Sequence, residues 1–343
     1  MASPKAAIFG LQGTTLLAEE KNFFHRVNPL GFILFARNCE SPDQLKALIS
    51  SLKSIQERDD VLILIDQEGG RVARLKPPYW RKAPAAKLFA DYAQSTSVNE
   101  GELEVYANAR LIAQELYQLG INVNCAPLAD VPVPGSHNII GDRAFGNEPQ
   151  QVALLADAQA RGLLDGGVLP VLKHIPGHGR ARADSHEELP VVYESLDILE
   201  KTDFIPFKKL SHLPLGMTAH ILYTAIDDKL PATLSPTVIN LIRREIGFDG
   251  LLMSDDLSMK ALGGSFEDRT IQSLNAGCDI VLHCNGKMEE MLPIANVLPA
   301  LSSQALERFA QAWAMLHKPY EYDYISAEKR IAALEGEYGR KTA

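Results

Sequence analysis

Side chains that can carry protons are concentrated between Lys173 and Pro190, where the chain reads KHIPGHGRARADSHEELP. This segment holds three of the nine histidines, together with an aspartate and two glutamates. Asp184 and His186 are separated by one residue, a spacing at which a carboxylate can contact an imidazole, fix its tautomer and raise its basicity. The pair is therefore a candidate for general acid–base catalysis.

Further polar side chains stand at the ends of apolar runs. They are Asp66 to Arg74, Asp130, Lys173 with His174, His220, Asp255 with Asp256, and His283 with Asn285. A single aspartate in such a place is often only a helix cap or a loop-ordering acceptor. Several charges around one cavity are costly unless a polar ligand uses them, and carboxylates among cations are typical of sugar recognition. If the runs form a closed sheet, one mouth is surrounded by five of these residues: Asp66, Arg74, Lys173, His174 and Asp255.

Arg143 lies in a long loop, IIGDRAFGNEP, and has two interpretations. One is a surface salt bridge with Asp142 or Glu148, which contributes little by itself. The other is that Gly141 and Gly146 shape the loop so that it presents the guanidinium to a ligand. The residues themselves leave both interpretations open.

Eight apolar runs of strand length are bounded by turn signals. They span residues 6–12, 31–37, 61–67, 121–131, 168–174, 215–223, 250–256 and 278–284. The runs are continuously apolar rather than alternating, which is expected of strands in a parallel sheet that is covered on both faces.

Helical segments with start and stop signals separate these runs. Residues 41–44, Ser-Pro-Asp-Gln, indicate a capping box with proline at the first helical position, and Ser235-Pro236 opens a helix in the same way. Gly120 and Gly247 are placed like glycines that end helices in a left-handed conformation. The alternation predicts an α/β fold, a (β/α)8 TIM barrel, with a doubly wound open sheet as the weaker alternative.

A single domain is expected to span the whole chain, residues 1–343. No low-complexity linker divides the sequence, and barrels of this length commonly form one unit. Residues 304–320 and 325–336 have the pattern of C-terminal helices that close the barrel.

Composition limits the partners that the protein can have. Hydrophobic residues make up 46% and charged residues 22%, as in ordinary globular proteins. The net charge of −9 argues against nucleic acid and membrane surfaces and leaves a small-molecule substrate. The N-terminal stretch MASPKAAIFGLQG lacks a signal-peptide pattern, and no apolar run approaches about eighteen residues, so a cytoplasmic protein is expected. The cysteines are interpreted as buried thiols: Cys39, Cys125, Cys278 and Cys284.

A metal site is conceivable because imidazole and carboxylate groups are common zinc ligands. The ligands available to it are His174, His178, Asp184 and His186. Metal-dependent barrel hydrolases often carry a His-x-His motif on the first strand, whereas this strand reads AAIFGLQ. We therefore expect neither a metal nor another cofactor.

The order of motifs along the chain resembles glycoside hydrolase family 3, and more narrowly the single-domain bacterial β-N-acetylglucosaminidases of peptidoglycan recycling. The motifs that carry the resemblance are ILFARN, DQEGGRVARL, APLADV, IGDRAFG, KHIPGHG followed by DSH, MTAH, SDDLSM and AGCDIVLHCN. They cover residues 33–285, nearly the whole predicted barrel. Many relatives add a second domain that completes the active site, whereas here only a short helical region follows the last strand.

The resemblance implies a role for each matching residue. Asp255 would be the catalytic nucleophile, His186 the general acid/base and Asp184 its partner. Strand alternation alone indicates only that Asp255 and Asp256 cannot both face the cavity. The resemblance also implies that N-acetylglucosamine is bound in the −1 subsite by Asp66, Arg74, Arg143, Lys173 and His174. It assigns no comparable role to Met217 or His220.

The implied reaction is retaining, exo-acting removal of N-acetylglucosamine from fragments such as GlcNAc-1,6-anhydroMurNAc and its peptides, through a covalent glycosyl-aspartate. Gly177 and Gly179 are expected to let the loop swing so that His186 approaches bound substrate. His178 and Ser185 are interpreted as loop architecture. Arg180 and Arg182 depart from the small and β-branched residues of some relatives, which puts the motion of the loop in doubt.

Several alternatives remain open. On the same fold they are a β-N-acetylglucosaminide phosphorylase, in which phosphate replaces water as acceptor, and a β-glucosidase. From other classes they are a metal-dependent barrel hydrolase built on His174, His178 and His186, and a sugar-binding barrel that has lost catalysis. No residue identifies the aglycone or the oligomeric state.

Overall fold

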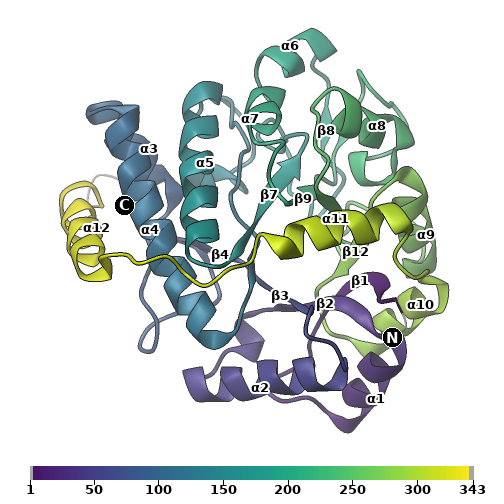
Figure 1. Cartoon of the computed structure of the whole chain (residues 1–343). Helices are drawn as coiled ribbons and strands as arrows, with labels where there is room; N and C mark the ends of the chain where they lie inside the picture. Colours follow the sequence, from purple (N-terminus) through teal and green to yellow (C-terminus); the bar gives the residue numbers. More distant parts are fainter. Residues whose placement is uncertain (1–2, 340–343) are drawn as a thin grey trace.

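The computed structural model describes residues 3–339 and contains a closed barrel of parallel strands (Figure 1). Its eight strands, among the described residues, are β1 (Lys5–Gly10), β2 (Pro29–Leu34), β3 (Leu62–Ile65), β6 (Val123–Asn124), β7 (Leu169–Ile175), β9 (Leu215–Thr218), β11 (Leu251–Asp256) and β12 (Ile280–His283). The order around the barrel is β1-β12-β11-β9-β7-β6-β3-β2. Every predicted run contributes one strand, which confirms the barrel and rules out the open sheet.

The predicted strand at 121–131 is much longer than the observed β6. The assigned strand ends at Asn124, although backbone hydrogen bonds to β7 continue beyond it: the carbonyls of Ala126 and Pro127 accept the N–H groups of Val171 at 2.8 Å and Lys173 at 3.1 Å. Side-chain bonds continue the connection: Asn124 accepts the backbone N–H of Gln67 at 2.9 Å and donates to its carbonyl at 3.0 Å.

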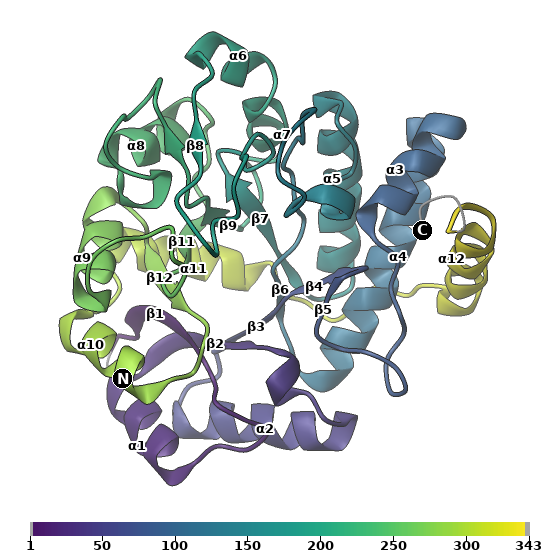
Figure 2. The same ribbon diagram turned by 180° about the vertical axis from the view of Figure 1, so that it is seen from behind.

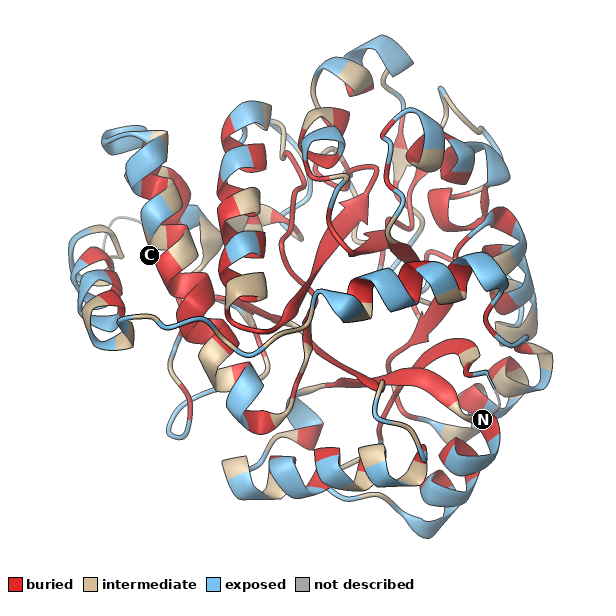
Figure 3. Ribbon diagram, viewed as in Figure 1, coloured by how far each residue is buried: buried red, intermediate tan, exposed pale blue. Residues whose placement is uncertain are grey.

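Helices surround the barrel and bury their inner faces against it, as the burial colours of Figure 3 show. Those that precede the C-terminal pair are α1 (Ala18–Val27), α2 (Pro42–Ile55), α3 (Ala86–Ser95), α4 (Val98–Leu119), α5 (Pro149–Asp165), α6 (Leu196–Lys201), α7 (Phe204–Lys209), α8 (Pro236–Arg244), α9 (Phe266–Ala276) and α10 (Met288–Val297). Short 3-10 turns lie at Ala36–Asn38, Gly141–Arg143 and Ala232–Leu234.

The predicted helix signals are used with small differences. The Ser41 hydroxyl accepts the N–H of Gln44 at 3.3 Å, but the Gln44 side chain accepts the N–H of Glu40 rather than that of Ser41, so the capping box is incomplete. Ser235 caps α8, and Gly120 ends α4 with a φ of 85°. Helix α8 already ends at Arg244, and Gly247 takes its positive φ of 81° in the turn that follows.

The C-terminal helices have different roles. Helix α11 (Ser303–Ala314) crosses the barrel in Figure 1, and its Ala305, Phe309 and Ala312 join the hydrophobic cluster that fills the barrel interior. Helix α12 (Tyr324–Tyr338) packs against α4 and α3 on the outside. The prediction that C-terminal helices close the barrel is therefore confirmed for α11, whereas α12 extends the outer layer.

Two small sheets lie among the loops that follow the barrel strands, on the face seen in Figure 2. Strands β4 (Gln67–Gly69) and β5 (Val72–Ala73) form an antiparallel pair directly after β3. Gly70 turns the chain between them with a φ of 57°. Strand β8 (Val191–Val192) pairs with β10 (Leu222–Tyr223). The first pair returns the chain toward the end of β3, where site residues are found.

Two composition-based expectations can be compared with the structure. None of the helices among residues 3–339 combines the length and the apolar content needed to cross a bilayer. All of the cysteines are free thiols: Cys125, Cys278 and Cys284 are buried, and Cys39 is half-buried.

Candidate active site

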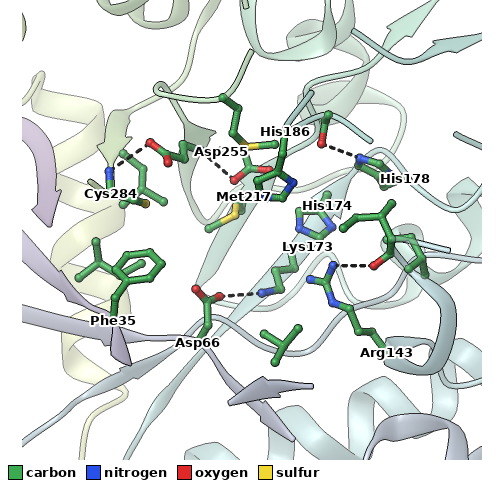
Figure 4. A pocket seen from close by; sticks show the side chains of 18 of the residues that line it. Phe35, Asp66, Arg143, Lys173, His174, His178, His186, Met217, Asp255 and Cys284 are labelled. Atoms are coloured by element: carbon green, nitrogen blue, oxygen red, sulfur yellow. Dashed lines mark hydrogen bonds and ion pairs between the residues drawn. The ribbon is translucent and has the colours of Figure 1, made fainter. Parts of the chain in front are cut away.

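A cavity of about 330 Å³ opens at the carboxyl ends of the barrel strands (Figure 4). Seven of the residues that the sequence singled out line it: Asp66, Arg74, Arg143, Lys173, His174, His186 and Asp255. Asp184 lies outside the wall and is hydrogen-bonded to His186. The structure thus brings the eight predicted residues together, although they are spread over residues 66–255. Apolar side chains complete the wall, including Phe35, Met217 and Met259.

The floor of the cavity is an ion-pair network centred on the buried Lys173. Its ammonium lies 3.0 Å from Asp66 Oδ1 and 2.6 Å from Glu68 Oε1, and Arg74 Nη2 lies 3.1 Å from Asp66 Oδ2. Burial raises the pKa of Asp66, but Lys173 and Arg74 outweigh this effect and leave that pKa below its ordinary value. Burial lowers the pKa of Lys173, whereas Glu68 and Asp66 raise it above the ordinary value, so the ammonium stays charged.

Glu68 is the functional candidate that the sequence reasoning missed. Arg143 donates two hydrogen bonds to the Glu68 carboxylate, from Nε and Nη2, each of 2.8 Å. The two interpretations of Arg143 are thereby resolved: Arg143 reaches the cavity, whereas Asp142 pairs with Arg71 at 2.7 Å. A signal for Glu68 was present, because it lies two residues after Asp66 in an extended segment and therefore faces the same side.

His174 is held from behind by Asp130, which is completely buried. One oxygen of Asp130 lies 2.8 Å from His174 Nδ1, and the other accepts the backbone N–H groups of His174 and His178 at 3.3 and 2.6 Å. Burial raises the pKa of Asp130, but the interactions with His174 lower it below the ordinary value. The carboxylate acceptor assigns the proton to Nδ1 and leaves Nε2 for a ligand.

Asp255 and Asp256 differ in their hydrogen-bond partners. Asp256 accepts bonds from the Ser258 N–H at 3.0 Å, the Ser258 hydroxyl at 2.6 Å and the Cys284 N–H at 3.1 Å, so its carboxylate orders the loops. Within residues 3–339, Asp255 accepts one bond, from the Asp256 N–H at 2.8 Å. Burial raises the pKa of Asp255, but the imidazoles of His220 and His174 lower it below the ordinary value. A carboxylate that is ionised and largely uncommitted has the properties of a nucleophile.

One expectation from strand alternation is wrong, because both aspartates contribute to the cavity wall. The register between β11 and β12 shifts between Met253 and Asp256, which interrupts strict alternation at the strand end. His220 lies behind this strand end, where its ring nitrogens contact the Thr233 hydroxyl at 2.7 Å and the Asp256 carbonyl at 3.0 Å.

Asp184 and His186 form the contact that their spacing predicts. Asp184 Oδ1 lies 2.8 Å from His186 Nδ1 and accepts the His186 backbone N–H at 2.9 Å. Partial burial raises the pKa of Asp184, and the hydrogen bonds from His186 lower it below the ordinary value. The His186 side chain is 60% exposed and borders the same cavity as Asp255 (Figure 4). Its Nε2 is thereby left to exchange a proton with a ligand.

The glycines of this loop do not have the surroundings expected of a hinge. A Cβ added to Gly179 would lie 2.0 Å from the Val131 carbonyl oxygen, so this glycine allows two backbone segments to pack closely. Gly177 has a φ of 140°, and its carbonyl accepts a hydrogen bond from the Tyr223 hydroxyl. The start of the loop is therefore packed against Val131 and Tyr223 in this structure, and the swing that would bring His186 to bound substrate stays a prediction.

Two further sequence-based hypotheses can be tested against the geometry. Arg180 does not line the cavity and pairs with Asp203 at 2.6 Å beside α7. For the metal hypothesis, no group of three or more His, Cys, Asp or Glu side chains within residues 3–339 is arranged to hold an ion. One ring nitrogen of each histidine has a partner: His174 Nδ1 contacts Asp130, His178 Nε2 contacts Ser185, and His186 Nδ1 contacts Asp184.

Together, the fold and this site define an enzyme of the (β/α)8-barrel class whose ligand is polar and sugar-like. Residues 11–313 match the family described as "Glycosyl hydrolase family 3 N terminal domain". The chain belongs to glycoside hydrolase family 3, and the protein is a glycosidase.

Relatives of known name agree with this assignment. The chain is 39% identical over 283 residues to "Beta-hexosaminidase" of Alkalilimnicola ehrlichii, covering 81% of this chain and 80% of that protein. It is 37% identical to "Beta-hexosaminidase" of Pseudomonas aeruginosa, with 82% and 83% covered. The crystal structure of NagZ from Neisseria gonorrhoeae in complex with N-trifluoroacetyl-D-glucosamine matches with a TM-score of 0.87 at 30% identity, over 97% of this chain and 98% of that one.

Proposed function

We propose that this protein is a retaining exo-β-N-acetylglucosaminidase that removes non-reducing terminal N-acetylglucosamine from peptidoglycan fragments, such as GlcNAc-1,6-anhydroMurNAc and its peptides. The observation that carries the proposal is that Asp255 and His186 border one cavity whose floor is the Asp66–Lys173–Glu68 network. The names of the relatives, β-hexosaminidases and NagZ, support the choice of an N-acetylated sugar. A muropeptide aglycone belongs to the proposal and rests on the resemblance alone, and a cytoplasmic location is carried into the proposal as the expectation from the sequence.

The size and charge of the cavity suit one sugar unit. Its volume of about 330 Å³ is near the lower end of the roughly 300–1,000 Å³ that is typical of ligand sites. Asp66 accepts hydrogen bonds, Arg74, Arg143 and Lys173 donate them, and His174 offers Nε2, so the hydroxyl groups of a single ring can be satisfied. A site that holds one terminal ring favours exo-acting cleavage.

In the first half of the reaction, Asp255 attacks the anomeric carbon of the bound sugar. His186 donates its Nε2 proton to the glycosidic oxygen as the bond to the aglycone breaks, and a glycosyl-Asp255 ester forms. The lowered pKa of Asp255 keeps the attacking carboxylate ionised at neutral pH. Asp184 stabilises the imidazolium until its proton is transferred.

In the second half, the roles reverse. Neutral His186 takes a proton from water, the resulting hydroxide attacks the anomeric carbon, and the bond to Asp255 breaks, which releases N-acetylglucosamine with its configuration retained. Retaining glycosidases usually use a second carboxylic acid, whose pKa must be raised for this task. An imidazole needs no such shift, because its ordinary pKa is about 6.5.

The proposal is tested with 4-nitrophenyl β-N-acetylglucosaminide. Wild-type protein is expected to release 4-nitrophenol, and Asp255→Ala to lose at least about 1,000-fold in kcat because the ester can no longer form. Asp59→Ala is the matched control, because it alters an exposed aspartate that does not line the cavity, and it should behave as wild type. Full activity of Asp255→Ala with an unchanged melting temperature would exclude the assigned nucleophile.

The competing activities give different products. A phosphorylase would form N-acetylglucosamine 1-phosphate when phosphate is added, and a β-glucosidase would cleave the 4-nitrophenyl glucoside faster than the N-acetylated substrate. The proposal predicts free N-acetylglucosamine in both the presence and the absence of phosphate. Retention is read from the anomer that NMR detects first.

A further inference from the structure

We propose that His178 is a positioning residue for the acid/base His186 and acts through a hydrogen bond to Ser185. This inference rests on the proposed function, in which His186 protonates the leaving group. It gives a task to the second histidine of the segment, which touches neither Asp184 nor His186 in the hydrogen bonds of the described residues.

The central contact joins two buried side chains. His178 Nε2 lies 3.1 Å from Ser185 Oγ, and these residues are only 3% and 2% exposed. Ser185 stands between Asp184 and His186, which are considerably more exposed. The loop therefore has a buried residue, Ser185, between the two more exposed members of the acid/base pair.

His178 itself is fixed to the barrel. Its backbone N–H donates to Asp130 at 2.6 Å, and the same carboxylate orients the sugar-binding candidate His174. The neighbouring Gly179 packs against the backbone of Val131. A bond from this ring to Ser185 consequently ties the exposed part of the loop to the rigid end of β7.

Ser185 also contacts the loop that follows β11, the strand that carries the proposed nucleophile. Its carbonyl accepts the Ala261 N–H at 3.2 Å, shortly after Asp255 and Met259 in the chain. Ser185 is thus attached to β7 by its side chain and to the loop after β11 by its backbone. These two attachments set where His186 stands relative to Asp255.

The ring is suited to a structural hydrogen bond rather than to proton transfer. Burial, followed by the nearby His174, lowers the pKa of His178 to about 4, so the imidazole is neutral at working pH. Its Nδ1 has no hydrogen-bond partner among the described residues. Neutral imidazole can either donate to the serine hydroxyl or accept from it, and either bond holds the loop in the same place.

The test compares substrates whose leaving groups need different amounts of acid assistance. His178→Ala and Ser185→Ala are assayed for kcat/KM on phenyl and on 2,4-dinitrophenyl β-N-acetylglucosaminide. Misplacing His186 is expected to lower kcat/KM about tenfold for the phenyl substrate and less than about twofold for the dinitrophenyl substrate, whose phenolate leaves with little protonation. The double variant should lose no more kcat/KM on the phenyl substrate than either single variant, because each single change already removes the same hydrogen bond.

Matched variants separate positioning from folding. His178→Gln, whose amide can reach the Ser185 hydroxyl, should restore most of the phenyl activity, and His212→Gln changes an exposed histidine as a control. Melting temperatures are measured for all variants. If His178→Ala does not fold, the substrate comparison with the smaller change Ser185→Ala decides whether the hydrogen bond positions His186. His186→Ala provides the reference pattern for complete loss of acid assistance.

The outcomes are distinct for the two claims. Suppose that wild-type protein cleaves both substrates. If the variants then lose kcat/KM equally on both substrates, or keep the wild-type kcat/KM on both, the positioning role is wrong while the proposed function stands. If the fold-losses in kcat/KM of the two single variants multiply in the double variant, the His178–Ser185 hydrogen bond is not the cause of those losses. If wild-type protein cleaves neither substrate, the proposed function fails and the positioning role fails with it.

Discussion

At the scale of single residues, the floor of the site is a network of buried cations and carboxylates that form ion pairs with one another. Three cations, Arg74, Lys173 and Arg143, face two carboxylates, Asp66 and Glu68, so the network holds one positive charge in excess. The ionised Asp255 lies on the same cavity, where the charges acting on it are the imidazoles of His220 and His174. Removing one partner of such a network is costly because it leaves a buried charge uncompensated.

Glu68→Gln tests this balance. The change deprives Arg143 and Lys173 of their shared carboxylate, and we expect kcat/KM for the aryl substrate to fall ~10- to 100-fold, mainly through KM, with a stability loss of about 3 kcal/mol. Glu148→Gln is the control, because the sequence offered Glu148 as a partner of Arg143 and the structure leaves it exposed. Equal behaviour of the two variants would contradict the network.

Asp130 gives a prediction about pH. Its folded-state pKa lies below the unfolded value of about 3.9, so its stabilisation is fully present above about pH 4 and is lost as pH falls through the folded-state pKa. Asp130→Asn should therefore cost about 2 kcal/mol at pH 7 and progressively less below pH ~4. Urea unfolding at a series of pH values measures the stability cost at neutral pH and its decrease in acid. A stability difference between wild type and Asp130→Asn that is independent of pH would refute the lowered pKa of Asp130.

At the scale of elements, apolar runs predicted all of the barrel strands, because continuous burial on both faces leaves a strong signal. The β4–β5 and β8–β10 pairs were missed as separate elements, because strands of two or three residues are too short to show a periodicity and β10 lies inside the run 215–223 that was predicted as one strand. The end of β11 was misjudged for a related reason, because a register shift depends on the neighbouring strand and not on local sequence.

Gly179→Ala distinguishes a hinge from a packing glycine. A Cβ at this position meets the Val131 carbonyl, so we expect a loss of about 1–3 kcal/mol in the free energy of unfolding. Gly263→Ala is the matched control, because nothing lies within 4 Å of the added Cβ. Similar unfolding curves for the two variants would mean that the loop moves away from Val131, and the hinge that the sequence indicated would be restored.

At the scale of the whole molecule, the barrel closes one end with α11 and leaves the other end for chemistry. Arg308 of α11 pairs with Asp249 at 2.6 Å and with Asp279 at 2.9 Å, which fixes the helix beside β11 and β12. The segment that leads into α12 is held differently: the buried Arg110 donates to the Tyr320 carbonyl at 2.6 Å and to the hydroxyl of Tyr324, the first residue of the helix, at 3.2 Å. The helical pattern of α12 was visible in the sequence, but this long-range contact was not.

The candidate site was more predictable than the loops around it. Strand ends converge in any barrel, so listing polar residues at those ends already gathered Asp66, Lys173, His174 and Asp255. The partners that hold them, Glu68 and Asp130, depend on side-chain geometry across several strands. The roles of individual residues came from the resemblance and stay proposals.

The central claim is that Asp255 forms a covalent bond to the sugar. Incubation with a fluorinated N-acetylglucosamine analogue that has a good leaving group, followed by proteolysis and mass spectrometry, tests it most directly. The account predicts one stoichiometric glycosyl adduct, on the peptide that contains Asp255 and localised to that carboxylate. An adduct on another side chain, or complete turnover of natural substrate with inversion and no trapped species, would contradict it.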